Sequence, residues 1–183
     1  LEDHVAVVGA GPSGLMIALL CQMAGATYVA ISDLVPFRLR KARELGLREV
    51  VDAREEELGE VVRAGTDGLG ADVVFVTAPS EKALQAGLGA LRKGGTLMVF
   101  APTAPGVKWP VEPNKLFFEE ITITASYSTT HLETRDAMSI IMAHKELFGK
   151  LITHVFKLDE IDLAFRLAKE DKNCLKVVVR GTG

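Results

Sequence analysis

Residues 5–14 read VAVVGAGPSG, an apolar run that breaks into the pattern G-x-G-x-x-G. A second apolar segment, Leu15 to Met23, follows directly. This order predicts a buried strand, a tight glycine turn and the start of a helix. Such a turn brings backbone N–H groups and the positive end of a helix dipole up to a pyrophosphate. The pattern favours a dinucleotide site, although the triplet alone also suits a turn that only joins a strand to a helix.

The three glycines of this turn are expected to serve different purposes. Gly9 permits the sharp turn out of the strand, Gly11 lets the backbone approach phosphate groups, and Gly14 lets the helix pack closely on the strand. Pro12 suits the first turn of a helix, where its missing N–H costs nothing.

An acidic residue follows the second predicted strand, residues 28–32, and lies nineteen residues after Gly14. At that distance Asp33 is expected to accept hydrogen bonds from an adenosine ribose. Its charge opposes a 2′-phosphate, since two unit charges about 4 Å apart repel by roughly 4 kcal/mol at an effective dielectric near 20. The sequence therefore predicts NAD rather than NADP. Arg38 is expected over the adenine or near the ribose, and a solvated helix position is the alternative.

Length and composition limit the classes of protein that remain. A chain of 183 residues suits one domain, or one domain with an appendage. The hydrophobic content of 48% allows a sizeable core. A net charge of −3 and a pI of about 5.8 argue against a nucleic-acid surface. No apolar run reaches the length needed to cross a bilayer, and no signal peptide is visible, so no membrane partner is expected.

Cysteine and histidine residues give no metal-ligand spacing, so no metal site is predicted in this chain. Cys21 lies in an apolar segment and is expected to pack there. With Cys174 it makes two distant thiols, which indicate a reducing compartment and a cytoplasmic location. No catalytic residue is predicted. His131 and Tyr127 are candidates that loop or helix-cap positions explain equally well.

Apolar strand-like segments alternate with helical ones along the chain. This alternation predicts an α/β fold, a doubly wound parallel six-stranded sheet of the Rossmann type. The expected strands are residues 5–8, 28–32, 49–52, 72–77, 96–101 and 121–126, with a turn at Gly94-Gly95 before the fifth. The expected helices are residues 12–24, 36–45, 80–91 and 130–147. A further helix is expected to be opened by the acidic residues 55–57. Ser80 is expected to cap its helix, and Thr130 to form a capping box with Glu133.

The NAD-binding domain is expected to span residues 1–150. Residues 151–183 then form an extension with a strand at 151–156, a helix at 159–168 and a strand at 175–179. Four prolines between residues 102 and 113 stiffen a long loop where the carboxyl end of a strand should face the ligand. Because the chain begins with Leu1 and its first strand follows at once, we expect a piece of a longer protein.

Several blocks resemble the cofactor-binding part of medium-chain, zinc-type alcohol and polyol dehydrogenases, with the sorbitol and threonine dehydrogenases most similar. The order of the blocks is specific and covers nearly the whole chain. They are VVGAGPSGL (7–15), SDL (32–34) with Arg38, KARELG (41–46), DVVFVTAPS (72–80), LRKGGTLMVF (91–100), LITHVFKLDEIDLAF (151–165) and LKVVVRG (175–181).

The resemblance implies that the chain binds NAD(H) and orients the nicotinamide for hydride transfer to or from an alcohol or polyol. In that family the zinc belongs mainly to a separate GroES-like domain, whose ligand motifs do not occur in this sequence. The resemblance therefore implies a fragment of an NAD-dependent dehydrogenase, inactive alone, whose own residues bind no zinc. The tail from Leu151 is expected to return to that catalytic domain.

The resemblance also implies where the cofactor lies. The pyrophosphate is expected over the glycine turn, with an N–H from Ser13, and the nicotinamide beside residues 100–102, with residues 125–127 near the same ring. The expected cofactor-binding residues are Gly9, Gly11, Pro12, Ser13, Gly14, Asp33, Leu34, Arg38, Val76, Thr77, Ala78, Phe100, Ala101 and Pro102.

A second copy of this chain is the partner expected for its sixth strand. Family members often dimerise through the sixth strand, so a homodimer or tetramer through residues 121–126 is expected, since an uncovered strand of this composition invites pairing. A covered edge strand in a monomer is the alternative. Two other functions stay open: a stand-alone NAD-sensing module without catalysis, and a methyltransferase, which also uses a glycine turn and an acid after the second strand.

Overall fold

The computed structural model describes residues 3–181, which form two compact units. The first unit extends to Tyr127 and the second begins at Ser128. The expected domain boundary after residue 150 lies within the second unit, between α7 (Lys145–Gly149) and β7 (Ile152–Lys157).

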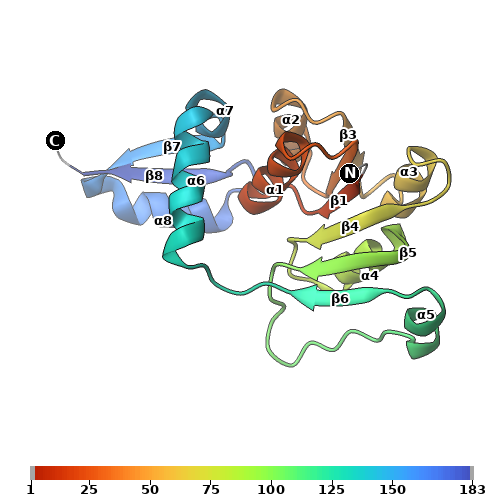
Figure 1. Cartoon of the computed structure of the whole chain (residues 1–183). Helices are drawn as coiled ribbons and strands as arrows, with labels where there is room; N and C mark the ends of the chain where they lie inside the picture. Colours follow the sequence, from red (N-terminus) through yellow and green to blue (C-terminus); the bar gives the residue numbers. More distant parts are fainter. Residues whose placement is uncertain (1–2, 182–183) are drawn as a thin grey trace. The chain divides into compact units, whose positions relative to one another are not determined.

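A six-stranded parallel sheet forms the centre of the first unit, in the order β3-β2-β1-β4-β5-β6 (Figure 1). Because the order reverses between β1 and β4, the carboxyl ends of these strands form the edge where doubly wound sheets bind ligands. The predicted Rossmann-type α/β fold is confirmed. The strands are β1 (His4–Val8), β2 (Tyr28–Asp33), β3 (Glu49–Asp52), β4 (Ala71–Val76), β5 (Leu91–Val99) and β6 (Thr122–Ala125).

The helices that connect these strands cover the sheet and bury its apolar residues. They are α1 (Pro12–Met23), α2 (Pro36–Glu44), α3 (Leu58–Ala64) and α4 (Glu81–Ala90). Alternate residues of each strand face opposite sides of a sheet. Ala6 and Val8 of β1 and Ala30 of β2 share a buried cluster with apolar side chains of α3 and α4. Residues of the same parity in β1 and β2 therefore face α3 and α4.

Two local predictions for the first unit are wrong, and one helix was not predicted. Gly94-Gly95 is not a turn before the fifth strand, because β5 begins at Leu91, which pairs with Ala71 ahead of a register irregularity. The acidic residues 55–57 precede α3 instead of opening it, with Glu57 as its N-cap. The loop after β5 contains a short helix, α5 (Pro113–Phe118), that the sequence analysis missed.

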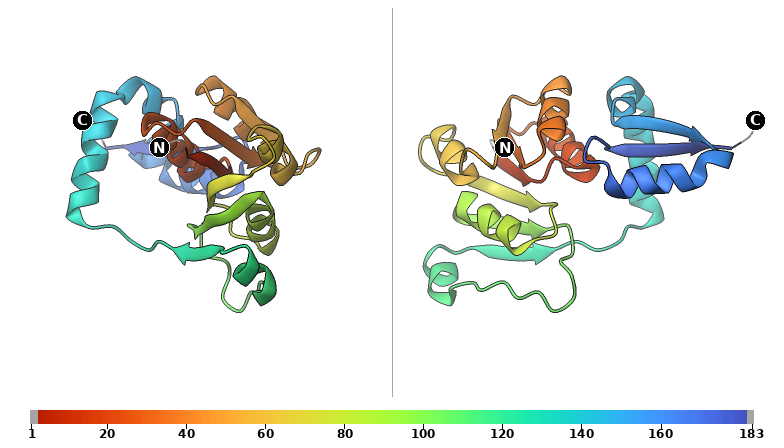
Figure 2. Two further views of the ribbon diagram at one scale, coloured as in Figure 1. Left: turned by 45° about the vertical axis from the view of Figure 1, so that its right-hand side comes forward. Right: turned by 180° about the vertical axis from the view of Figure 1, so that it is seen from behind.

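The second unit has a two-stranded parallel sheet, β7 and β8 (Lys176–Arg180), joined by a short 3₁₀ turn, η1 (Leu158–Glu160), and α8 (Ile161–Glu170) (Figure 2). The predicted extension of strand, helix and strand is confirmed. The capping box of Thr130 and Glu133 opens α6 (His131–Ala143) as predicted. The continuous helix to residue 147 is wrong, since His144 leaves helical geometry at φ −123° and separates α6 from α7. None of the helices in the described residues is long and apolar enough to cross a membrane.

Candidate nucleotide-binding site

Two glycines of the β1–α1 turn are required by the packing of the protein itself. Gly9 has a φ of +104°, which side chains of L residues rarely adopt, and a Cβ there would lie 2.7 Å from Thr77 Oγ1. A Cβ on Gly14 would overlap the carbonyl oxygen of Gly9. These two residues therefore hold α1 close to the end of β1.

Gly11 differs, because no contact among residues 3–181 requires a glycine at this position. Its φ is −68°, an ordinary value, and apart from its chain neighbours no heavy atom of these residues lies within 4 Å of the place where a Cβ would stand. Gly11 is the N-cap of α1, so this open space lies beside the unpaired N–H groups at the start of that helix. An open, approachable backbone at a helix N-terminus fits a phosphate group.

Asp33, at the end of β2, is held by backbone groups on both carboxylate oxygens. The Ala10 N–H donates to Oδ2 at 2.7 Å, and the Val35 N–H donates to Oδ1 at 2.8 Å. The residue is only 9% exposed. Each carboxylate oxygen has a second lone pair, so the fixed carboxylate still accepts bonds from a hydroxyl-bearing ligand.

Arg38, in the first turns of α2, extends toward this carboxylate. Its Nη1 lies 3.5 Å from Asp33 Oδ2, and about a third of its side chain is exposed. Its Nε is buried without a hydrogen-bond partner among the described residues. Buried donors are nearly always paired, so an unpaired Nε beside Asp33 fits a site that a polar ligand completes.

The residues expected at the end of β4 hold the sheet together. The Thr77 hydroxyl lies 3.0 Å from the carbonyl oxygen of Val8 and 2.9 Å from that of Gly9, and so ties β4 to the glycine turn. The carbonyl oxygen of Val76 accepts the N–H groups of Phe100 and Ala101 at 3.0 and 3.1 Å. These bonds place the start of the loop after β5 beside the end of β4.

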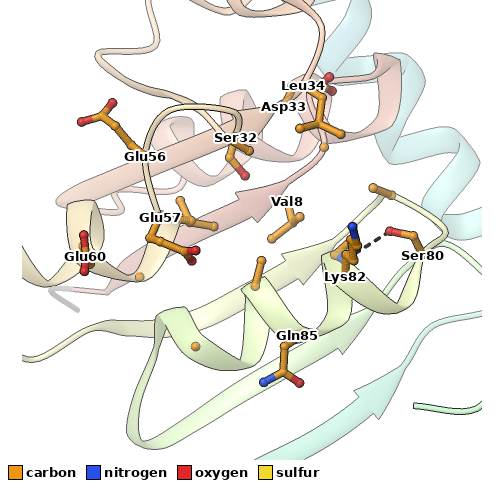
Figure 3. Close-up of a pocket in the computed structure, with 18 of the residues that line it drawn as sticks. Val8, Ser32, Asp33, Leu34, Glu56, Glu57, Glu60, Ser80, Lys82 and Gln85 are labelled. Carbon is orange, nitrogen blue, oxygen red and sulfur yellow. Dashed lines mark hydrogen bonds between the residues drawn. The ribbon is translucent and has the colours of Figure 1, made fainter. Parts of the chain in front are cut away.

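A cavity of about 790 Å³ lies between the carboxyl ends of β1 and β2 and the helices α3 and α4 (Figure 3). The sequence-predicted residues that line it are Gly9, Asp33, Leu34, Arg38 and Ala78. The other sequence-predicted residues are not in its lining: Gly11, Pro12, Ser13, Gly14, Val76, Thr77, Phe100, Ala101 and Pro102.

The wall of this cavity that α3 and α4 provide was not predicted from the sequence. The polar lining residues outside the prediction include Ser32 of β2, Glu57 at the N-cap of α3, and Lys82 and Gln85 of α4. One signal was available: Ser32 lies two residues after Ala30 in β2, which places both side chains on the same face of the sheet. The pairing of α3 with α4 depends on tertiary packing, and no local pattern of the sequence encodes it.

Neither candidate for catalysis forms part of a polar cluster. Tyr127 is 99% exposed and lies after β6, and His131 is an exposed residue at the start of α6. In the part of the chain that the structure describes, no three His, Cys, Asp or Glu side chains lie close enough to hold a metal ion. The polar groups that the fold gathers are those of the glycine turn, Asp33 and the cavity.

A family model described as zinc-binding dehydrogenase matches residues 12–143. The chain belongs to the zinc-binding dehydrogenase family. Its fold agrees, since an alcohol dehydrogenase structure from Thermotoga maritima superposes with a TM-score of 0.92 at 28% identity, over 98% of this chain and 50% of that one. A 2R,3R-butanediol dehydrogenase structure from Bacillus subtilis gives 0.84 at 26% identity, over 99% and 51%.

Two curated relatives of this zinc-type dehydrogenase chain carry named activities. An L-threonine 3-dehydrogenase of a Chelativorans species is 34% identical over 86% of this chain and 45% of its own length. A sorbitol dehydrogenase of Halalkalibacterium halodurans is 32% identical over 97% of this chain and 51% of its own length. The chain thus spans about half the length of these relatives, and that half has the Rossmann-type fold.

Proposed function

We propose that this chain binds NAD(H) at the carboxyl edge of its six-stranded sheet, as the cofactor domain of an NAD-dependent dehydrogenase. The observation that carries the proposal is the open space at Gly11. The protein's own packing does not need a glycine here, beside the N-terminus of α1. A pyrophosphate that must lie close to the protein backbone explains it.

Asp33 and Arg38 support the adenosine end of the same proposal. The two backbone N–H groups fix the carboxylate so that it faces a ligand in one orientation. Its charge favours a free ribose hydroxyl over a phosphate, which selects NAD(H). Bound NAD supplies a hydride acceptor, and the part of this chain is to hold and orient it.

The reaction proposed for the whole protein is oxidation of a small alcohol, polyol or amino alcohol. The names of the relatives support this class, and so does the family's description as zinc-binding. Residues outside this chain would hold the zinc. We further propose a reducing compartment such as the cytoplasm, in keeping with two free cysteines, Cys21 and Cys174.

Pairing with a second copy through β6 is also proposed. This strand ends the six-stranded sheet, and its outer edge has no neighbouring strand among the described residues. An edge of alternating threonine and apolar residues, with no charge or proline in Thr122–Ala125, is open to strand addition.

The test of cofactor binding uses calorimetric titration of the chain with NADH, comparing the wild type with Gly11→Val. We expect saturable binding by the wild type and a loss of at least about tenfold in affinity in the variant, because the valine side chain fills the open space. The melting temperature checks that the variant folds. Equal NADH affinity in both proteins would contradict the proposed place of the pyrophosphate.

A further inference from the structure

The cavity beside Asp33 continues past the place of a ribose. From the end of β2 it extends along the groove between α3 and α4, where Gly59, Arg63 and Gly89 line its far part. Arg63 Nη1 donates to the carbonyl oxygen of Gly89 at 2.8 Å and so closes the two helices against each other. If Asp33 takes the ribose hydroxyls, as in the proposed function on which this inference rests, the attached base must enter this cavity.

Ser32 provides a polar group on the sheet side of that space. The residue is only 2% exposed, and Figure 3 shows its hydroxyl turned into the cavity. None of the hydrogen bonds between described residues involves this hydroxyl. The hydroxyl therefore faces the cavity with its donor and acceptor capacity free for a ligand.

Glu57 provides the second polar group, from the N-cap of α3. Its side chain makes no capping hydrogen bond, and Figure 3 shows the carboxylate turned toward the cavity below Val8. The carboxylate of the adjacent Glu56 points away from it. An ionised carboxylate only accepts hydrogen bonds, whereas the serine hydroxyl both donates and accepts.

We propose that Glu57 accepts a hydrogen bond from the amino group of adenine, with the Ser32 hydroxyl beside a ring nitrogen, so that this cavity reads the base of the cofactor. Adenine presents an amino donor flanked by ring-nitrogen acceptors, which matches an acceptor at Glu57 and a donor at Ser32. Hypoxanthine presents an oxygen in place of the amino group. That oxygen and the Glu57 carboxylate are both acceptors, so no hydrogen bond forms between them.

The experiment titrates the whole chain with NADH and with reduced nicotinamide hypoxanthine dinucleotide, by calorimetry. The variants are Glu57→Gln, whose amide can also donate to an oxygen, and Glu55→Gln. The second makes the same change of charge in the same loop, at a residue that does not line the cavity. Far-ultraviolet circular dichroism confirms that each variant is folded.

We expect the wild type and Glu55→Gln to bind NADH about tenfold tighter than the hypoxanthine form, the effect of one hydrogen bond to a charged group. In Glu57→Gln the two affinities should differ by no more than about twofold. Wild-type protein that binds both forms equally, or a Glu57→Gln variant that keeps the tenfold preference, would overturn the inference and leave NAD(H) binding intact. Failure of the wild type to bind either form would instead contradict the proposed function.

Discussion

At the scale of single residues, the three glycines of the β1–α1 turn divide by the space around them. Gly9 and Gly14 are fixed by the protein's own atoms, whereas Gly11 faces open space. The pattern G-x-G-x-x-G alone assigns these roles only by analogy. The positions of hypothetical Cβ atoms separate the two glycines that the fold needs from Gly11, which we assign to the proposed pyrophosphate site.

This difference predicts a large loss of stability from one alanine substitution and a small change from another. Gly14→Ala should lower the free energy of unfolding by at least about 2 kcal/mol, because the new Cβ would overlap a backbone oxygen that cannot move freely. Gly11→Ala should change it by no more than about 1 kcal/mol, the range for a helix N-cap. Urea denaturation of both variants measures this, and similar losses in the two would contradict the packing argument.

Asp72, at the amino end of β4, predicts a dependence of stability on pH. Burial by itself would raise its pKa, but the His4 backbone N–H and the Arg92 guanidinium together hold the pKa below its ordinary value of 3.8. A carboxylate with a lowered pKa stabilises the folded state above its unfolded pKa, and this contribution is lost as pH falls through the folded-state pKa.

We therefore expect Asp72→Asn to be less stable than the wild type at pH 7, with a gap that narrows as the pH falls below about 4. Thermal unfolding of both proteins between pH 7 and pH 2 measures the gap. A gap that stays constant over this range would show that the charge of Asp72 does not contribute.

At the scale of elements, the N-cap of α4 supports one wall of the cavity. The Ser80 hydroxyl accepts the Ala83 N–H at 3.2 Å, as the sequence predicts. Ser80→Ala should cost about 1 kcal/mol of stability, and Ser80→Asp should keep most of it, because aspartate also accepts this bond. Chemical denaturation distinguishes the two variants, and equal stability of both would argue against a capping role.

Helix ends that local capping residues define were predictable from the sequence. Element boundaries that depend on pairing or packing with other segments were not. The sequence predicts two N-caps, one from Ser80 and one from Thr130 with Glu133. Both caps are present. The start of β5 was missed because Gly94-Gly95 suggests a turn, whereas pairing of Leu91 with Ala71 keeps this segment in the sheet. The break at His144 was not predicted because no glycine or proline lies beside it in the sequence.

The candidate site follows the same rule. The glycine turn and Asp33 were predictable because their spacing along the chain is short and fixed by the strand–turn–helix unit. Glu57 and Gln85 were not, since they approach the cavity only after α3 and α4 pack on one face of the sheet. Ser32 is an intermediate case, because its position in β2 was predictable from the sequence but the direction of its hydroxyl into the cavity was not.

At the scale of the whole molecule, the free edge of β6 predicts self-association. Ile123, 37% exposed, lies in the middle of this strand. Ile123→Lys should shift the chain toward a monomer, because a lysine on an edge strand opposes strand addition. Sedimentation velocity measures the mass, and Ile152→Lys, at an exposed isoleucine of β7, is the matched control. A wild-type chain that is already monomeric would refute pairing through β6.

Asp33 and the glycine turn together are proposed to make a site for NAD(H). Parallel calorimetric titrations of the wild-type chain with NADH and NADPH test it most directly. We predict saturable binding of NADH and binding of NADPH that is weaker by at least about tenfold, because the fixed carboxylate repels a 2′-phosphate. Equal affinity for the two cofactors, or binding of neither, would contradict the account.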